Sequence, residues 1–296
     1  MLTQPLWKSA LILACVLAGA GSVNAAKKPI PAVKKPIKAA SAVNPRYTFV
    51  AYGDTRSNPD VHRTIIDLIV AQKPEFVLQS GDLVSDGGNP RQWTEFSEIT
   101  KPLRDAHIAY YPSRGNHDAG PYYQNYVTEP FEPGGNKYYY AFTRHKNHFI
   151  VLDEFQDYAI GSDQYQWLER ELKKGQKTAV NTFVLFHESP FSVGPHGPTG
   201  MAQRNVHPLF VKYRPRAVFC GHDHLYYRTK RDGVNYLVTG GGGAPLYQAD
   251  NAALAIPGDV YVSDYHIIRC EVNGTQVSGT VITPSGKVID KFVFKP

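Results

Sequence analysis

Short polar motifs recur along this chain, each directly after an apolar run typical of a β-strand. The runs are Tyr47–Tyr52, Phe76–Gln79, Ala109–Tyr111, Thr182–Phe186 and Ala217–Cys220, and the motifs after them are Gly53-Asp54, Gly81-Asp82, Gly115-Asn116-His117-Asp118, His187 and Gly221-His222-Asp223-His224. In an open α/β sheet, the loops beyond the carboxyl ends of parallel strands meet in one crevice. The pattern therefore predicts a single polar site assembled from distant segments.

Helical periodicity fills most of the spaces between these strands, and then it disappears. Amphipathic segments are predicted at Val61–Ala71, Trp93–Ala106, Ser162–Leu172 and Val206–Tyr213, with a hairpin formed by Tyr138–Phe142 and Phe149–Leu152. Beyond them, the strands Tyr236–Thr239, His266–Val272, Gln276–Ile282 and Lys287–Phe294 follow one another through Gly, Asn and Pro turns. An α/β beginning with an all-β finish favours two packed sheets with helices outside.

The positive charge of the chain lies outside this predicted fold. The full sequence of 296 residues carries 32 basic and 26 acidic residues, a formal net charge of +6. Residues 1–45 hold six lysines and no acidic residue, which leaves 26 basic and 26 acidic residues from Arg46 onward. The charge therefore does not indicate a nucleic-acid-binding core.

The N-terminal segment resembles a targeting sequence. After Lys8, a charge-free run that is too short for a membrane span ends in Val23-Asn24-Ala25, which predicts a signal peptide over residues 1–25 and a periplasmic or secreted protein. A retained anchor, or lipidation at Cys15, is the alternative. Residues 26–45 alternate Lys, Pro and Ala. This composition predicts an extended spacer, or alternatively a segment that contacts the anionic cell envelope. We expect the folded domain to span residues 46–296.

Export leaves the state of Cys220 and Cys270 open. An oxidising compartment permits a disulfide between them. Both residues also lie in strand-like runs, where buried free thiols are common.

The residue types after the strands are those of a metal centre. Carboxylate and amide oxygens together with imidazoles suit Mn²⁺, Fe or Zn²⁺, and two such ions about 3.5–4 Å apart can polarise a phosphoryl group and lower the pKa of a water molecule. Other catalytic patterns fail, since the chain has no Gly-x-Ser-x-Gly elbow and no Gly-x-x-x-x-Gly-Lys loop. The glycine run Gly240–Gly243 precedes Pro245 and no helix, so it does not indicate a dinucleotide site.

The ordered motifs resemble those of the calcineurin-like metallophosphoesterase superfamily, in particular its bacterial branch similar to purple acid phosphatases. The resemblance covers residues 46–243, and the run from Tyr236 to Pro245 also looks like that branch. It implies a four-layer α/β/β/α sandwich of two mixed sheets that hydrolyses phosphate esters with two metal ions. By the resemblance, Asp82 bridges the ions, Asn116, His187 and His222 bind one of them, Asp54 and His224 bind the other, and His117 lies beside the leaving group.

Two positions depart from the family pattern. Most members have a His where this chain has Arg56, and purple acid phosphatases have a Tyr where it has Ser85. A guanidinium stays protonated and cannot bind a metal, so we expect the site on Asp54 and His224 to hold its ion more weakly. We expect Arg56 to bind substrate phosphate instead, or else to be a structural partner of Asp54. The absence of the Tyr argues against an Fe(III)–tyrosinate centre.

Further side chains near these motifs have expected roles. We expect Asp118 to orient the ring of His117, and Asn116 and His196 to contact substrate, although a solvent-exposed His196 without a role is an equal alternative. Asp86 is predicted to be a turn residue. The aromatic residues Tyr122, Tyr123 and Tyr126 fit core packing better than stacking on a base.

The sequence thus predicts an exported, metal-dependent hydrolase acting on a small phosphate ester. The hypothesis for its mechanism is in-line attack on a phosphomonoester by a hydroxide that bridges two metal ions, with His117 assisting the leaving oxygen. A phosphodiesterase or nucleotide hydrolase fits the same motifs. An envelope-binding protein with a decayed site is an alternative from another class, supported by Arg56.

Overall fold

The computed structural model describes residues 46–126 and 138–295. The predicted signal peptide, the predicted linker and part of the loop after Asn116-His117 lie outside these residues. The helices are α1 (Pro59–Gln72), α2 (Pro90–Ile99), α3 (Lys101–Asp105), α4 (Tyr123–Tyr126), α5 (Asp163–Thr178), α6 (Gly200–Asn205) and α7 (His207–Tyr213), with 3₁₀ turns at Asn116–Asp118 and Ala252–Leu254. None of the helices in this described part is both long and apolar enough to cross a membrane.

The strands form two mixed sheets. The first sheet has the order β13-β12-β11-β1-β2-β3, and the second has the order β10-β8-β9-β7-β6-β5-β4. The strands are β1 (Tyr47–Tyr52), β2 (Phe76–Gln79), β3 (Ala109–Pro112), β4 (Tyr140–Arg144), β5 (Asn147–Val151), β6 (Asn181–Glu188), β7 (Ala217–Gly221), β8 (Tyr226–Arg231), β9 (Val234–Thr239), β10 (Val260–Val262), β11 (Ile267–Asn273), β12 (Gln276–Ile282) and β13 (Val288–Phe294). Strands β1, β2 and β3 are mutually parallel, as are β5, β6 and β7.

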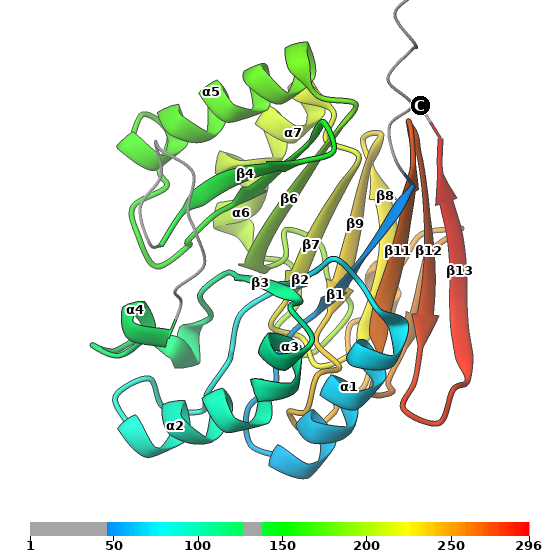
Figure 1. Ribbon diagram of the computed structural model, residues 1–296. Helices are drawn as coiled ribbons and strands as arrows, with labels where there is room; N and C mark the ends of the chain where they lie inside the picture. The colour runs from blue at the N-terminus through cyan, green and yellow to red at the C-terminus, as the bar shows by residue number, and fades with distance from the viewer. Residues whose placement is uncertain (1–45, 127–137, 296) are drawn as a thin grey trace, which may run out of the picture. The chain divides into compact units, whose positions relative to one another are not determined.

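Alternating side chains join the two sheets and their helices into four layers. In β1, Phe49 and Ala51 belong to the cluster between the sheets, whereas Val50 and Tyr52 pack with α1 on the outer face. The outer face of the second sheet packs against α5 and α7, and Figure 1 shows these helices on the far side from α1 to α3. Successive strand residues point to opposite faces, so both faces of β1 are apolar. The predicted α/β/β/α sandwich is confirmed.

Several predicted boundaries are wrong in detail. The helix predicted over Trp93–Ala106 is two helices, because Pro102 lacks the N–H that a continuous helix needs, and α2 ends at Ile99. The predicted helix Val206–Tyr213 begins at His207 and is preceded by α6, which the sequence did not indicate. Strands β8 and β10 were also not predicted. The two cysteines Cys220 and Cys270 are buried free thiols that belong to different core clusters.

Candidate metal centre

The parallel strands of both sheets bring the predicted site residues to one end of the sandwich. Asp54 and Asp82 follow β1 and β2, Asn116 and His117 form the 3₁₀ turn after β3, His187 lies near the end of β6, and His222 and His224 follow β7. Contacts between these side chains, given below, link the first sheet to the second. The loops therefore form one site, as their position after parallel strands predicts.

Three of the candidate metal ligands have left-handed backbone conformations. The φ angles are 58° at Asp54, 56° at Asp82 and 71° at His222. Such angles are uncommon for residues other than glycine and persist where surrounding contacts impose them. Here the Asp54 N–H donates to the Gly81 carbonyl at 3.0 Å, and the Thr55 N–H donates to the Asp82 carbonyl at 2.9 Å. The loops after β1 and β2 thus hold each other in the conformation that turns both carboxylates inward.

Asp82 lies at the middle of the site and is 1% exposed. Its Oδ1 accepts the His117 backbone N–H at 3.0 Å and lies 3.5 Å from His187 Nε2. Burial favours the protonated carboxyl, but the neighbouring His187, the hydrogen bond from the His117 N–H and the guanidinium of Arg56 outweigh it and lower the pKa of Asp82. The carboxylate is therefore ionised and available to cations on both sides.

Asp82, Asn116, His187 and His222 form what we call the first half-site. His187 Nδ1 donates to the Ser80 carbonyl at 2.7 Å, which leaves the lone pair of Nε2 free. That nitrogen lies 3.0 Å from Asn116 Oδ1 and 3.2 Å from His222 Nδ1. Burial and the neighbouring His187 lower the pKa of His222 to about 3, so its ring is neutral. This convergence of an amide oxygen, a carboxylate oxygen and two imidazole nitrogens fits a divalent metal ion.

Asp54, Asp82 and His224 form the second half-site, and their ligand atoms all lie within 4.8 Å of one another. His224 Nδ1 donates to the Pro245 carbonyl at 2.7 Å, so Nε2 is the nitrogen that faces Asp54 Oδ1 at 3.6 Å. Burial lowers the pKa of His224 to about 4. Burial and the nearby Asp82 raise the pKa of Asp54, against the opposing hydrogen bond from the His222 N–H. This donor set also fits a divalent ion, which would keep Asp54 ionised.

Arg56 inserts its guanidinium into the second half-site. Its Nε donates to Asp82 Oδ2 at 3.0 Å, and its Nη2 lies 3.4 Å from His224 Nε2. The side chain is 16% exposed, so one edge of the guanidinium remains open to a substrate. The structural partner foreseen for Arg56 was Asp54, and the carboxylate that it contacts is Asp82.

His117 and Asp118 are adjacent but do different things. His117 is half-buried, and its Nδ1 donates to the Ser85 carbonyl at 2.9 Å. The Asp118 carboxylate instead accepts the backbone N–H groups of Leu83 and Gly115 at 2.8 Å and of Val84 at 3.1 Å. The expectation that Asp118 orients the His117 ring is therefore wrong. Asp118 joins the loops after β2 and β3, which positions Asp82 and Asn116.

His196 lies over the first half-site on the loop after β6. Its ring centroid is 4.0 Å from that of His222, and its Nδ1 is 2.9 Å from Asp223 Oδ1. His196 thus contacts a candidate metal ligand while 41% of its side chain is exposed, and its contact with substrate stays a prediction. Asp223 is a supporting residue that the sequence analysis missed. Its position between two predicted ligands was the available signal.

The glycine run after β9 supports the second half-site by close packing. The Gly242 N–H donates to the Gly53 carbonyl and the Ala244 N–H to the Asp54 carbonyl, both at 2.8 Å. A Cβ added at Gly242 would lie 2.3 Å from the Gly53 carbonyl oxygen, so a side chain there would push the β1 loop away. Tyr247, which the sequence did not single out, stacks on His224 with ring centroids 4.0 Å apart.

A family model for calcineurin-like phosphoesterases matches residues 47–226, which contain every half-site residue. The chain belongs to this family.

The chain is similar in sequence and in structure to purple acid phosphatases. It is 29% identical to a purple acid phosphatase of Glycine max over 225 residues, which is 68% of this chain and 48% of that protein. It is also 29% identical to the Fe(3+)-Zn(2+) purple acid phosphatase 12 of Arabidopsis thaliana over 62% of this chain and 44% of that protein. The chain thus spans about half the length of these relatives. The structure of a purple acid phosphatase from Lupinus luteus superposes with a TM-score of 0.73 at 19% identity, covering 84% of this chain and 53% of that one.

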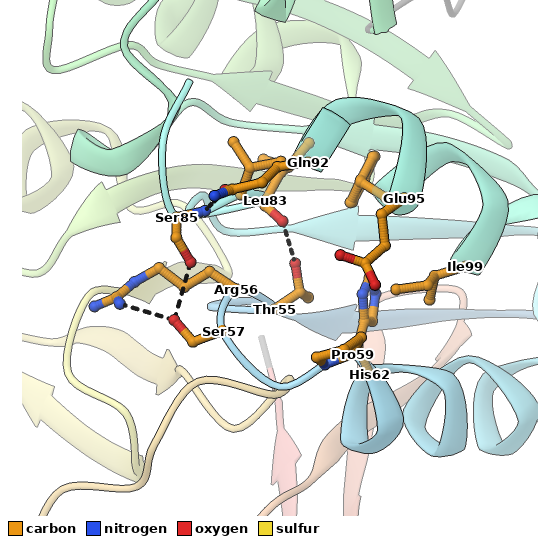
Figure 2. A pocket seen from close by; sticks show the side chains of 12 residues that line it. Thr55, Arg56, Ser57, Pro59, His62, Leu83, Ser85, Gln92, Glu95 and Ile99 are labelled. Carbon is orange, nitrogen blue, oxygen red and sulfur yellow. Dashed lines mark hydrogen bonds between the residues drawn. The ribbon is translucent and has the colours of Figure 1, made fainter. Parts of the chain in front are cut away.

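A cavity of about 150 Å³ lies beside the second half-site, and Arg56, Ser57 and Ser85 are among the residues that line it. Figure 2 shows Ser57 beside Ser85 and bonded to the Arg56 guanidinium, and the two serine hydroxyl oxygens are 3.0 Å apart. Glu95 from α2 and His62 from α1 line the far side of the cavity. The short side chain of Ser85 places a hydroxyl at this edge of the site.

Asp86 and the tyrosines after His117 have structural roles in this part of the molecule. Asp86 is a turn residue, since its Oδ1 accepts the Gly88 N–H at 2.9 Å. The aromatic residues after His117 pack rather than face the site, because Tyr123 is buried and Tyr126 stacks on Trp93. Core packing was the favoured interpretation of these tyrosines.

Proposed function

We propose that the chain is a metal-dependent phosphoesterase that hydrolyses phosphomonoesters. The observation that carries this proposal is the convergence of two imidazoles and an amide oxygen on one side of Asp82, and of Asp54 and His224 on the other. Two divalent ions bound there would supply positive charge for a phosphoryl transition state and would activate a water molecule. The family match and the Fe(3+)-Zn(2+) relative support the choice of two ions.

The chain's own residues then have separate tasks. Asp82 faces both half-sites and would hold the two cations at a fixed separation. As water attacks phosphorus, the bond to the leaving oxygen breaks and that oxygen gains negative charge. His117 is fixed by the hydrogen bond from its Nδ1–H to the Ser85 carbonyl, and as an imidazolium it would donate the proton on Nε2 to the leaving oxygen and become neutral. The open edge of Arg56 and the exposed part of His196 would bind the phosphate oxygens.

The first test compares two substrates on the purified protein, stripped of metal and resupplied with Mn²⁺. We expect Mn²⁺-dependent release of p-nitrophenol from the phosphomonoester and little from the bis-ester. Preference for the bis-ester would instead identify a phosphodiesterase. Mn²⁺ binding without turnover of either ester would favour the decayed, envelope-binding alternative.

The role of His117 is tested by His117→Gln. The amide keeps a hydrogen-bonding group but cannot transfer a proton, so kcat is expected to fall by about 10²–10⁴-fold with Mn²⁺ content unchanged. The fall should be largest for esters with poor leaving groups, which need the proton most. Full activity on an alkyl phosphate would exclude His117 as the acid.

We further propose that the protein is exported after cleavage behind Ala25, with residues 26–45 as a spacer. The charge-free run after Lys8 and the Val23-Asn24-Ala25 sequence support this proposal. The N-terminal sequence of the mature protein tests it, because a chain that begins at Ala26 is expected. An acylated Cys15 at the N-terminus would show lipoprotein processing instead.

A further inference from the structure

Arg56 contacts the same atoms that the second half-site would offer to an ion. Its Nε holds Asp82 Oδ2 at 3.0 Å, and its Nη2 lies 3.4 Å from His224 Nε2, the nitrogen left with a lone pair by the hydrogen bond to Pro245. Asp82 and His224 are each 1% exposed. In this arrangement the guanidinium takes the place of a cation between them.

A metal ion and this guanidinium cannot share the second half-site in these positions. The ion would need the lone pairs of Asp82 Oδ2 and His224 Nε2, toward which the guanidinium nitrogens now point. Both groups are positively charged, and repulsion between charges at contact distance is strong where little water intervenes. Among the residues that the structure describes, the first half-site has no such competitor, because the atoms around His187 Nε2 belong to Asn116, His222 and Asp82.

We infer that Arg56 is a resident cation of the second half-site, and that a metal ion binds there only by displacing it. This inference rests on the proposed metal-dependent function and specifies the order in which the two half-sites bind metal ions. The first half-site takes its ion at low metal concentration, whereas the second takes an ion only as Arg56 releases Asp82. The displaced guanidinium remains at the rim, since Ser57 Oγ already accepts from its Nη1 at 3.3 Å.

The inference also gives Arg56 a second position. At the rim, Arg56 lies beside Ser57 and Ser85 (Figure 2) and lines with them the cavity through which a phosphate anion would enter. Arg56 would therefore exchange one anion, Asp82, for another, the phosphate. Arginine suits both partners because its planar donors match carboxylate and phosphate alike.

The test is Mn²⁺ binding, measured by titration calorimetry and checked by elemental analysis, on the full chain without substrate. Wild type is expected to bind one Mn²⁺ tightly and a second at least about tenfold more weakly. Arg56→Gln keeps a polar side chain without charge, and the second affinity should rise at least about tenfold while the first changes less than twofold. Arg56→His, which supplies an imidazole, should tighten the second site as well and provides a second variant if the first folds poorly.

A matched control is Arg63→Gln, which removes a nearby positive charge on α1 whose partners are Asp60 and Glu95. Neither Mn²⁺ affinity should change in this variant. Two equally tight sites in wild type, or a second site that Arg56→Gln leaves unchanged or weakens, would overturn the inference while leaving the proposed function intact. Absence of Mn²⁺ binding in wild type and variants alike would contradict the proposed function itself.

Discussion

The two half-sites share one carboxylate but are built differently. On the His187 side of Asp82, the three further donors are two imidazoles and an amide oxygen, and the contacts of His187 with Ser80, Asn116 and His222 orient its ring. On the Asp54 side, a second buried carboxylate stands close to the first, and a guanidinium contacts Asp82 and His224. The comparison shows that loops at the same end of the sheets can form two cation sites with different properties. A metal ion can bind the first half-site directly, whereas in the second half-site it must first displace the positively charged Arg56.

Both sheets contribute to each half-site. Asn116 follows β3 of the first sheet and joins His187 and His222 of the second, whereas Asp54 follows β1 and joins His224, which follows β7. Asp54 and Arg56 lie on one loop and are separated by one residue, so a single substitution on that loop changes the groups around the second half-site. Arg56 reaches the first half-site through the shared Asp82.

The largest expected effect is that of Asp82→Asn, because both half-sites depend on this side chain. Losing the shared negative charge should lower kcat/KM for p-nitrophenyl phosphate by roughly a thousandfold or more and should weaken Mn²⁺ at both half-sites. Asp86→Asn, in the exposed turn of the same loop, is the matched control and should keep wild-type activity. Loss of only one ion in Asp82→Asn would mean that Asp82 is not shared.

A smaller effect separates the half-sites. His187→Ala removes the central imidazole of the first half-site and should weaken the tighter Mn²⁺ at least about 100-fold, whereas His224→Ala should leave that ion in place and affect only the weaker one. Calorimetric titration of both variants beside wild type measures the difference. If His224→Ala abolished the tighter binding, the assignment of strong and weak half-sites would be reversed.

The sequence allowed both the layers and the strand ends to be predicted, for a physical reason. Alternation in β1 and the helical period of α1 are local patterns, and parallel strands bring their carboxyl ends together wherever they pair. Strand β8 was not predicted because Arg228, Lys230 and Arg231 give it the composition of an exposed polar segment, although Tyr226 and Tyr227 are buried. Its identity depends on pairing with β9 and β10 rather than on its own composition.

Within the site, residue types could be predicted from the motifs, but their contacts could not. The carboxylate of Asp118 accepts hydrogen bonds from backbone N–H groups in the loop after β2 and at Gly115, and Arg56 donates to Asp82 from the neighbouring loop. Those partners are determined by left-handed turns at Asp54 and Asp82, which no local preference of aspartate specifies. Tyr247 reaches His224 from a loop whose course depends on the packing of the glycine run against β1.

The smallest expected effect is on stability, and it tests whether the buried carboxylate of Asp54 in the second half-site destabilises the protein when no metal is bound. Burial beside Asp82 raises the pKa of Asp54 in the folded state above its unfolded value, so the carboxyl lowers stability as the pH rises from the unfolded pKa to the folded pKa, and this cost persists at higher pH. Asp54→Asn removes that cost and suits the left-handed backbone, which asparagine tolerates. In a metal chelator at pH 7, the variant should be more stable than wild type by roughly 1–3 kcal/mol, seen as a higher melting temperature.

The sign of this effect must reverse or vanish under two conditions. Well below the ordinary aspartate pKa of 3.8, wild-type Asp54 is protonated in both states, so the advantage of Asp54→Asn should disappear. In excess Mn²⁺, wild type gains stability from binding an ion that the variant holds poorly, and the order of melting temperatures should invert. Asp60→Asn, at an exposed carboxylate on α1, should show neither change. A less stable Asp54→Asn in chelator at pH 7 would mean that the buried carboxylate is compensated within the protein, by Arg56 and the His222 N–H, before any metal arrives.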